Sequence, residues 1–170
     1  MQKKCVAVHR LISTPSIVCG IIAAIFWIVV RILSGSPYDL LHKIDGIELF
    51  PPIWLYSLCC FIWSYLLGSS VGIINETITC KKGIDYERNA YRGGIKFLLS
   101  FFLFLSYYPL MFAREAIFIS VICVLLSAVS SCACSYFWLK ISGIASLIMG
   151  GFALWELYVF IISFSVLLSR

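Results

Sequence analysis

The chain has 170 residues, of which 62% are hydrophobic and 12% are charged, with a net charge of +5 and a mean hydropathy of +1.01. Soluble domains carry about 25% charged and 45–50% apolar residues, so this composition excludes a soluble domain and predicts an integral membrane protein. The basic residues are scattered over short segments, so the positive charge indicates membrane topology and not a nucleic-acid partner. We expect a single integral membrane domain over residues 1–170.

Five apolar segments follow one another along the chain, each bounded by polar or turn residues. Helices are the only open-chain elements that satisfy their own backbone hydrogen bonds in lipid, and these segments lack the alternation of barrel strands. We therefore predict an all-α, polytopic membrane protein with a bundle of five transmembrane helices. The predicted helices cover residues 15–33, 51–74, 94–112, 116–138 and 141–168.

The first segment, 15–33, follows Lys3, Lys4 and Arg10, and a basic start is also typical of a signal peptide. The apolar part of a signal peptide spans about 7–15 residues, whereas this run is nearer to roughly 20. We therefore expect an uncleaved transmembrane helix.

The second segment opens on Pro51-Pro52-Ile53-Trp54. Proline suits the first turn of a helix, where its missing N–H would have no partner, and tryptophan prefers the depth at which lipid headgroups begin. These residues predict a helix that begins at a membrane surface. Trp54 would be an anchor there, or the rim of a ligand site.

The distribution of charge predicts the orientation, because lysine and arginine mark the cytoplasmic side. The N-terminal tail is basic, the 34–50 loop is acidic, and the 75–93 loop carries an excess of bases. The bases in and next to that last loop are Lys81, Lys82, Arg88, Arg92 and Lys96. We expect a bacterial plasma membrane, with the N-terminus and the 75–93 loop in the cytoplasm and the 34–50 loop and the C-terminus outside.

Glu156 is an acid deep inside an apolar segment, about midway along 141–168. A charge at that depth costs about 2.5–3.5 kcal/mol on insertion scales, so such acids usually face a cavity or a partner. One interpretation is a polar contact to a ligand or a proton-linked site. The other is a protonated or hydrogen-bonded glutamate that is satisfied by a serine or tyrosine of a neighbouring helix. No base is available at matching depth, which favours the neutral form.

Aromatic residues make up 16% of the chain and gather in stripes at helical spacing. One face of the second segment carries Trp54, Leu58, Phe61 and Tyr65, another carries Tyr56, Cys60, Trp63 and Leu67, and the fifth segment carries Phe152, Trp155, Glu156 and Val159. Such stripes usually pack against other helices. Two stripes that converge around a polar group would also suit a flat hydrophobic ligand.

The other polar residues point to packing more than to chemistry. Ser127, Ser130, Ser131, Cys134 and Ser135 follow one another at helical spacing on the fourth segment. Small residues let helices approach closely, so we expect a packing seam, with a polar channel wall as the alternative. The eight cysteines are expected to act as small hydrophobes, and His9 and His42 as solvated residues and not as haem ligands.

In order along the chain, these features resemble the tryptophan-rich sensory protein family (TspO), whose mitochondrial members are called translocator protein or peripheral benzodiazepine receptor. The second helix of that family opens with Pro-Pro-x-Trp and continues to a glycine, as 51–54 and Gly68 do here. Its third helix ends in a sequence similar to 107–112 (Tyr-Tyr-Pro-Leu-Met-Phe). Its fifth helix opens like 141–146 and carries a tryptophan where Trp155 stands.

The chain departs from the family pattern at several positions. The second-helix tryptophan of the family falls on Cys60, and the third-helix asparagine falls on Phe104. The fifth-helix Pro-Tyr pair becomes Gly151-Phe152, and the closing Leu-Asn becomes Ile162-Ser163. These departures put the family's polar ligand contacts in doubt.

The resemblance implies an interior pocket, capped by the 34–50 loop, that binds flat hydrophobic molecules. Porphyrins and other tetrapyrroles are the leading class, with sterols and synthetic isoquinoline-type ligands in animal members. The positions that match its ligand-binding site are Pro51 and Pro52 at the mouth and Trp54, Tyr107 and Trp155 in the wall, and we add Glu156 as a substitute polar contact.

The resemblance further implies a homodimer within the lipid bilayer, with no required cofactor. We expect a receptor, sensor or transporter with no catalytic residue and no metal site. Two alternatives remain open. One is an enzyme-like photo-oxidation of porphyrin, and the other is a structural subunit of a larger membrane complex.

Overall fold

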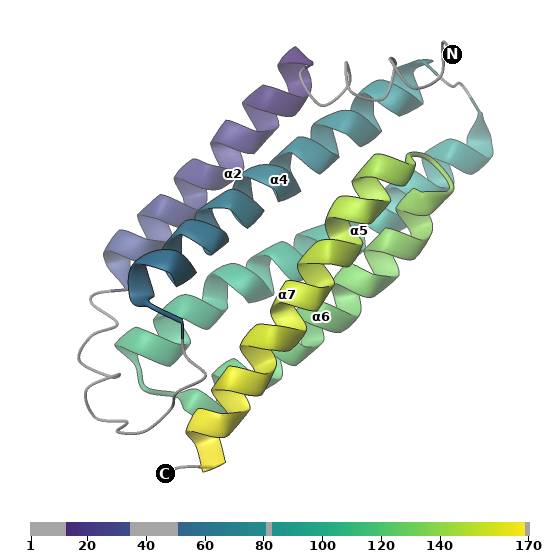
Figure 1. Ribbon diagram of the computed structural model, residues 1–170. Coiled ribbons are helices and arrows are strands. Elements are labelled where there is room, and N and C mark those ends of the chain that lie inside the picture. Colours follow the sequence, from purple (N-terminus) through teal and green to yellow (C-terminus); the bar gives the residue numbers. More distant parts are fainter. Residues whose placement is uncertain (1–12, 35–50, 81–82, 169–170) are drawn as a thin grey trace.

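The computed structural model describes residues 13–34, 51–80 and 83–168, and within them the chain is helical almost throughout (Figure 1). Five helices are long and apolar enough to cross a membrane, which confirms the predicted all-α fold. They are α2 (Thr14–Leu33), α4 (Ile53–Cys80), α5 (Ile84–Tyr108), α6 (Ile117–Leu139) and α7 (Gly143–Leu168), and a π-helix, η1 (Pro109–Ala113), follows α5 directly.

Successive helices run antiparallel, so α2 begins and α7 ends at opposite ends of the bundle (Figure 1). The helix α2 packs on α4, α4 meets α7, and α6 packs between α7 and α5. The helix α5 touches both α2 and α4 and so closes the ring. The start of α4, the end of α5 and the start of α6 therefore lie at one end of the bundle.

Glycines bring α2 and α4 together. A Cβ atom at Gly68 would overlap the backbone carbonyl of Cys19, and one at Gly72 would lie 2.5 Å from Ser16 Cα. The hydroxyl of Ser16 donates to the carbonyl of Ser69 over 3.1 Å. Lipid offers helices no hydrophobic drive to associate, so close backbone contact and hydrogen bonds across the seam hold such a pair.

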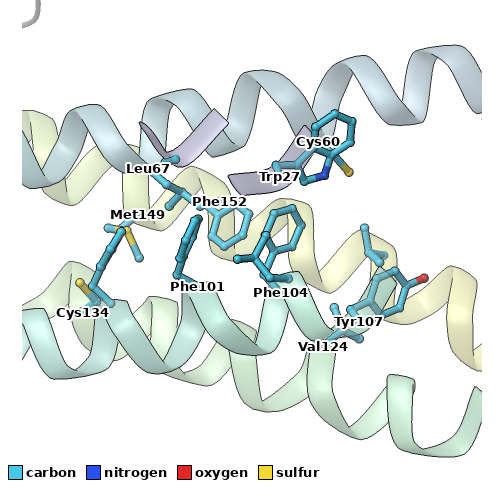
Figure 2. Close-up of a cluster of buried hydrophobic side chains, with 14 of the residues drawn as sticks. Trp27, Cys60, Leu67, Phe101, Phe104, Tyr107, Val124, Cys134, Met149 and Phe152 are labelled. Atoms are coloured by element: carbon cyan, nitrogen blue, oxygen red, sulfur yellow. The ribbon is translucent and has the colours of Figure 1, made fainter. Parts of the chain in front are cut away.

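Aromatic and aliphatic side chains fill the space between the helices (Figure 2). Phe104 of α5 meets Phe152 of α7 edge to face, with ring centroids 5.1 Å apart. Trp27, Cys60 and Leu67 approach this cluster from α2 and α4. Many large apolar side chains on the outer surface remain exposed, as expected for a surface that faces lipid.

The prediction of a loop over residues 75–93 is wrong, because α4 continues to Cys80 and α5 already begins at Ile84. Glutamate, lysine and arginine are good helix formers, so a helix can continue after its apolar stretch ends. The polar residues marked the end of the apolar stretch and not the end of the helix. The other predicted ends lie within two residues of those in the structure, and those at 33 and 168 match it, except that the third segment ends in the π-helix.

The π-helix and the turn after it end the third segment. Arg114 N donates to the carbonyl of Pro109 over 3.0 Å, and Glu115 adopts a positive φ of 51°. A left-handed conformation is uncommon outside glycine, asparagine and aspartate, and here it reverses the chain before α6. The preceding Tyr107 and Tyr108 are thereby held inside the bundle, each 1% exposed.

Candidate functional site

The two prolines stand directly before the first residue of α4. Tyr56 N donates to the carbonyl of Pro52 over 3.0 Å, so Pro52 accepts the first hydrogen bond of the helix. From this start, a helical period places Leu55, Tyr56 and Cys59 on the side of α4 that faces α7. The position of the prolines therefore sets which side chains meet α7.

A cavity of about 220 Å³ lies between the start of α4 and the middle of α7. Its lining consists of Pro51, Leu55, Tyr56, Cys59, Trp155 and Tyr158. Three of these six side chains are aromatic and little of the surface is polar. Ligand sites are typically concave and apolar, with a few polar groups that fix orientation, and this cavity has that character.

The rings around the cavity form a continuous series across four helices. Tyr56 lies against Trp155 at 5.8 Å between centroids and against Tyr108 at 6.0 Å. Tyr108 in turn meets the edge of Trp27 at 6.2 Å. The guanidinium of Arg31 lies 5.5 Å from the centroid of Tyr108, within the range of a cation–π contact.

Some polar groups near these rings form hydrogen bonds within the bundle, and at least one does not. The hydroxyl groups of Tyr107 and Ser163 are 2.9 Å apart, which ties α5 to α7. The indole N–H of Trp27 is buried and meets no acceptor within the described part of the chain. A buried donor without a partner is costly, so Trp27 could supply a hydrogen bond to a molecule bound among these rings.

The structure brings two of the predicted site residues together and separates the others. Pro51 and Trp155 both line the cavity, and Pro52 lies exposed beside its mouth. Trp54 is 68% exposed and points away from the bundle, and Leu58 on the same face is also exposed. Phe61, further along that face, meets Trp27 of α2 at 6.2 Å between centroids. On α4 the other predicted face, with Tyr56 and Cys60, is the one that turns inward.

Tyr107 and Glu156 lie inside the bundle but are not among the residues that line the cavity. Glu156 faces α6, where the hydroxyl groups of Ser127 and Ser131 lie within hydrogen-bond distance of its two carboxyl oxygens. Of the two interpretations of Glu156, the structure favours the one in which neighbouring serines satisfy it. The serine seam predicted on α6 is therefore also a polar contact to α7.

Four cavity residues were not predicted as ligand-binding, namely Leu55, Tyr56, Cys59 and Tyr158. A helical period counted from Pro51 and Pro52 would have reached the first three, and Tyr158 follows Trp155 by three positions on α7. In the described ranges no group of three or more histidine, cysteine or acidic residues could hold a metal ion. His9 and His42, and most of the 34–50 loop expected to cap the pocket, lie outside the described residues.

These features define a class of protein, namely a polytopic helical membrane protein with a small aromatic cavity inside its bundle. The family model of the TspO/MBR family matches residues 16–168, nearly the whole chain. The chain belongs to the TspO/MBR family, which is generally not enzymatic. A search among curated proteins gives no match to the chain.

Proposed function

We propose that this protein is a membrane receptor, sensor or transporter that binds flat hydrophobic molecules, with porphyrins and other tetrapyrroles as the leading class. The observation that carries the proposal is the cavity between α4 and α7, where the rings of Tyr56 and Trp155 stand 5.8 Å apart. A planar π-system stacks on such rings with little loss of conformational entropy. Family membership supports a ligand-binding role of this kind.

The size of the cavity limits how such a ligand would bind. Sites for drug-sized molecules usually measure about 300–1,000 Å³, and this cavity measures about 220 Å³. A tetrapyrrole would place one edge in the cavity against Tyr56 and Trp155 and extend past Pro51. The proposal therefore makes Trp155 a wall of the site and leaves Trp54 outside it.

A titration of purified protein in nanodiscs with protoporphyrin IX tests this proposal. Binding is followed by the absorption of the porphyrin itself, because the variants below remove a tryptophan fluorophore. Trp155→Leu should weaken binding about tenfold, since the loss of a stacked aromatic contact is worth roughly 0.5–1.5 kcal/mol beyond its buried area. Trp54→Leu is the matched control and should bind like the unchanged protein.

Two results would overturn the proposal. In the first, the unchanged protein does not bind protoporphyrin IX. In the second, the two leucine variants bind equally weakly, which would indicate partition into the protein–lipid boundary and no defined site.

We further propose that the protein resides in a bacterial plasma membrane, with the start of α2 on the cytoplasmic side. We also propose that it assembles as a homodimer. The orientation is supported by Arg88, Arg92 and Lys96 near the start of α5 and by Lys140 after α6, which lie at the same end of the bundle. Cys80 is exposed at that end. In a variant that keeps only this cysteine, a membrane-impermeant maleimide should label inverted vesicles and spare right-side-out vesicles. The reverse pattern would contradict the orientation.

A further inference from the structure

Glu156 lies at the junction of α5, α6 and α7 and is fully buried. Ser127 and Ser131, both on α6 and one turn apart, contact its two carboxyl oxygens, the second over 2.7 Å. Ser100 of α5 completes the group, with its hydroxyl 2.6 Å from that of Ser131. All three serines are themselves buried, away from the surface of the bundle.

The hydrogen atoms in this group can be counted. The group holds five hydrogen-bond contacts, and the longest joins the hydroxyl groups of Ser100 and Ser127 at 3.2 Å. The four shorter contacts each need one hydrogen: Ser127 to Glu156, Ser127 to the carbonyl of Ser100 at 2.8 Å, Ser131 to Glu156, and Ser100 to Ser131. The three hydroxyl groups supply three hydrogens, and Ser127 stands in two of the contacts with one hydrogen. An ionised carboxylate supplies none. A proton on Glu156 supplies the fourth, since Glu156 then donates to Ser127 and Ser127 donates to the Ser100 carbonyl.

Among residues 13–34, 51–80 and 83–168, no base forms an ion pair with Glu156 in place of that proton. Lys96 is the nearest base along α5, one turn before Ser100. Lys96 and Glu156 are both described by the structure, and they form no ion pair with each other. The other helices present rings to this part of α7: Phe104 from α5 and Trp63 from α4 both contact Phe152, one turn before Glu156. Cys134, one turn beyond Ser131 on α6, is a buried free cysteine. An unpaired carboxylate in such a place costs several kcal/mol.

We propose that Glu156, Ser100, Ser127 and Ser131 form a proton-binding site inside the membrane and that its proton stays bound at neutral pH. The bound proton completes the hydrogen bonds that join α5, α6 and α7. The site is separate from the cavity between α4 and α7, because Glu156 faces α6 and does not line that cavity.

Infrared spectroscopy of the protein in nanodiscs at pH 7 tests this proposal directly. A protonated carboxylic acid gives a C=O stretching band apart from the carboxylate bands, and that band shifts on transfer to D₂O. The unchanged protein should show the band, and Glu156→Gln should lack it. Glu87→Gln removes an exposed acid near the start of α5 and is the matched control, which should keep the band. If the unchanged protein shows no such band at pH 7, Glu156 is ionised and the proposal is overturned.

The pH dependence of thermal unfolding provides a second test, which remains valid if a variant folds less well. The folded state keeps the proton, while an exposed glutamate loses it above about pH 4.3, so folding takes up a proton and stability falls as the pH rises. Glutamine is isosteric and cannot ionise. The midpoint of the unchanged protein should therefore fall relative to that of Glu156→Gln between pH 6 and pH 9. Parallel profiles of the two proteins would overturn the proposal.

Discussion

Trp155 and Glu156 are adjacent in sequence, yet they take part in separate structures within the bundle. Trp155 stacks near Tyr56 of α4 beside the cavity, whereas Glu156 bonds to Ser127 and Ser131 of α6. Successive residues of a helix lie about 100° apart, which is enough for the two side chains to face different neighbours. The helix α7 therefore joins an aromatic site on one side to a polar network on the other.

This separation predicts that the two sites can be changed independently. Glu156→Gln keeps the shape of the side chain and should leave the dissociation constant for protoporphyrin IX within about twofold of the original, since additivity holds for sites without shared partners. Trp155→Leu should weaken the binding and leave the infrared C=O band unchanged. Titration and infrared spectra of the same two variants measure both effects. A large loss of porphyrin affinity in Glu156→Gln would show that the sites are coupled.

The close contact between α2 and α4 predicts a specific cost for a single methyl group. The Cβ of Gly68→Ala would overlap the backbone of Cys19, which cannot rotate away, so the variant should lose about 1–3 kcal/mol of stability. Gly94→Ala is the matched control on α5, where a Cβ meets nothing within 4 Å. That change should be neutral or stabilise the protein by up to about 1 kcal/mol, because alanine favours a helix over glycine. Unfolding in detergent micelles compares the two, and equal effects would contradict the packing described for α2.

The serine contacts predict unequal effects for neighbouring serines of α6. Ser127→Ala and Ser131→Ala each leave an oxygen of Glu156 without its hydrogen-bond partner, and an unsatisfied buried group costs about 1–3 kcal/mol. Ser130 is also buried but makes no hydrogen bond to Glu156 within the described structure, so Ser130→Ala serves as the control. It should change stability by less than about 0.5 kcal/mol. The thermal unfolding midpoints of the three variants measure these effects. A loss of stability in Ser130→Ala as large as in the other two variants would argue against the hydrogen bonds between Glu156 and the serines of α6.

The hydrogen bond between Tyr107 and Ser163 predicts a smaller loss. Tyr107→Phe keeps the ring in the core and removes one buried hydrogen bond, so it should cost about 0.5–1.5 kcal/mol. The double variant with Ser163→Ala should lose less than the sum of the single changes, because both remove the same contact. If the stability losses of the two single variants add up in the double variant, the two side chains do not form this hydrogen bond.

The helices could be predicted from the sequence because lipid requires long apolar stretches, and the family could be predicted from motifs such as the one at 51–54. The end of α4 and the start of α5 could not, since both helices extend over polar residues outside the apolar stretch. Both aromatic faces of α4 are apolar, and lipid accepts an apolar face as readily as the core does. The sequence therefore could not decide that the face with Tyr56 turns inward while Trp54, 68% exposed, turns outward.

The hydrogen-bond partners of Glu156 could not be predicted from the sequence for a different reason. Serines on α6 were visible as a stripe, but only the packing of α6 against α7 shows that Ser127 and Ser131 reach the carboxyl group. Cys60 stands where the resemblance places a tryptophan of the family. The structure buries its side chain completely, so a tryptophan at this position would need different packing around it.

Cys59 provides a direct test of where a ligand binds, because it lines the cavity and is half-buried. In a variant that keeps only this cysteine, protoporphyrin IX at ten times its dissociation constant should slow alkylation by N-ethylmaleimide roughly tenfold, since about one protein in ten is then free. Cys80 is exposed at the far end of α4, about 30 Å away at 1.5 Å per residue, and a variant that keeps only Cys80 is the control. Its alkylation should proceed at the same rate with and without porphyrin. Equal slowing at both positions would indicate a general effect of the porphyrin on the membrane, and no slowing at Cys59 would place the ligand outside the cavity.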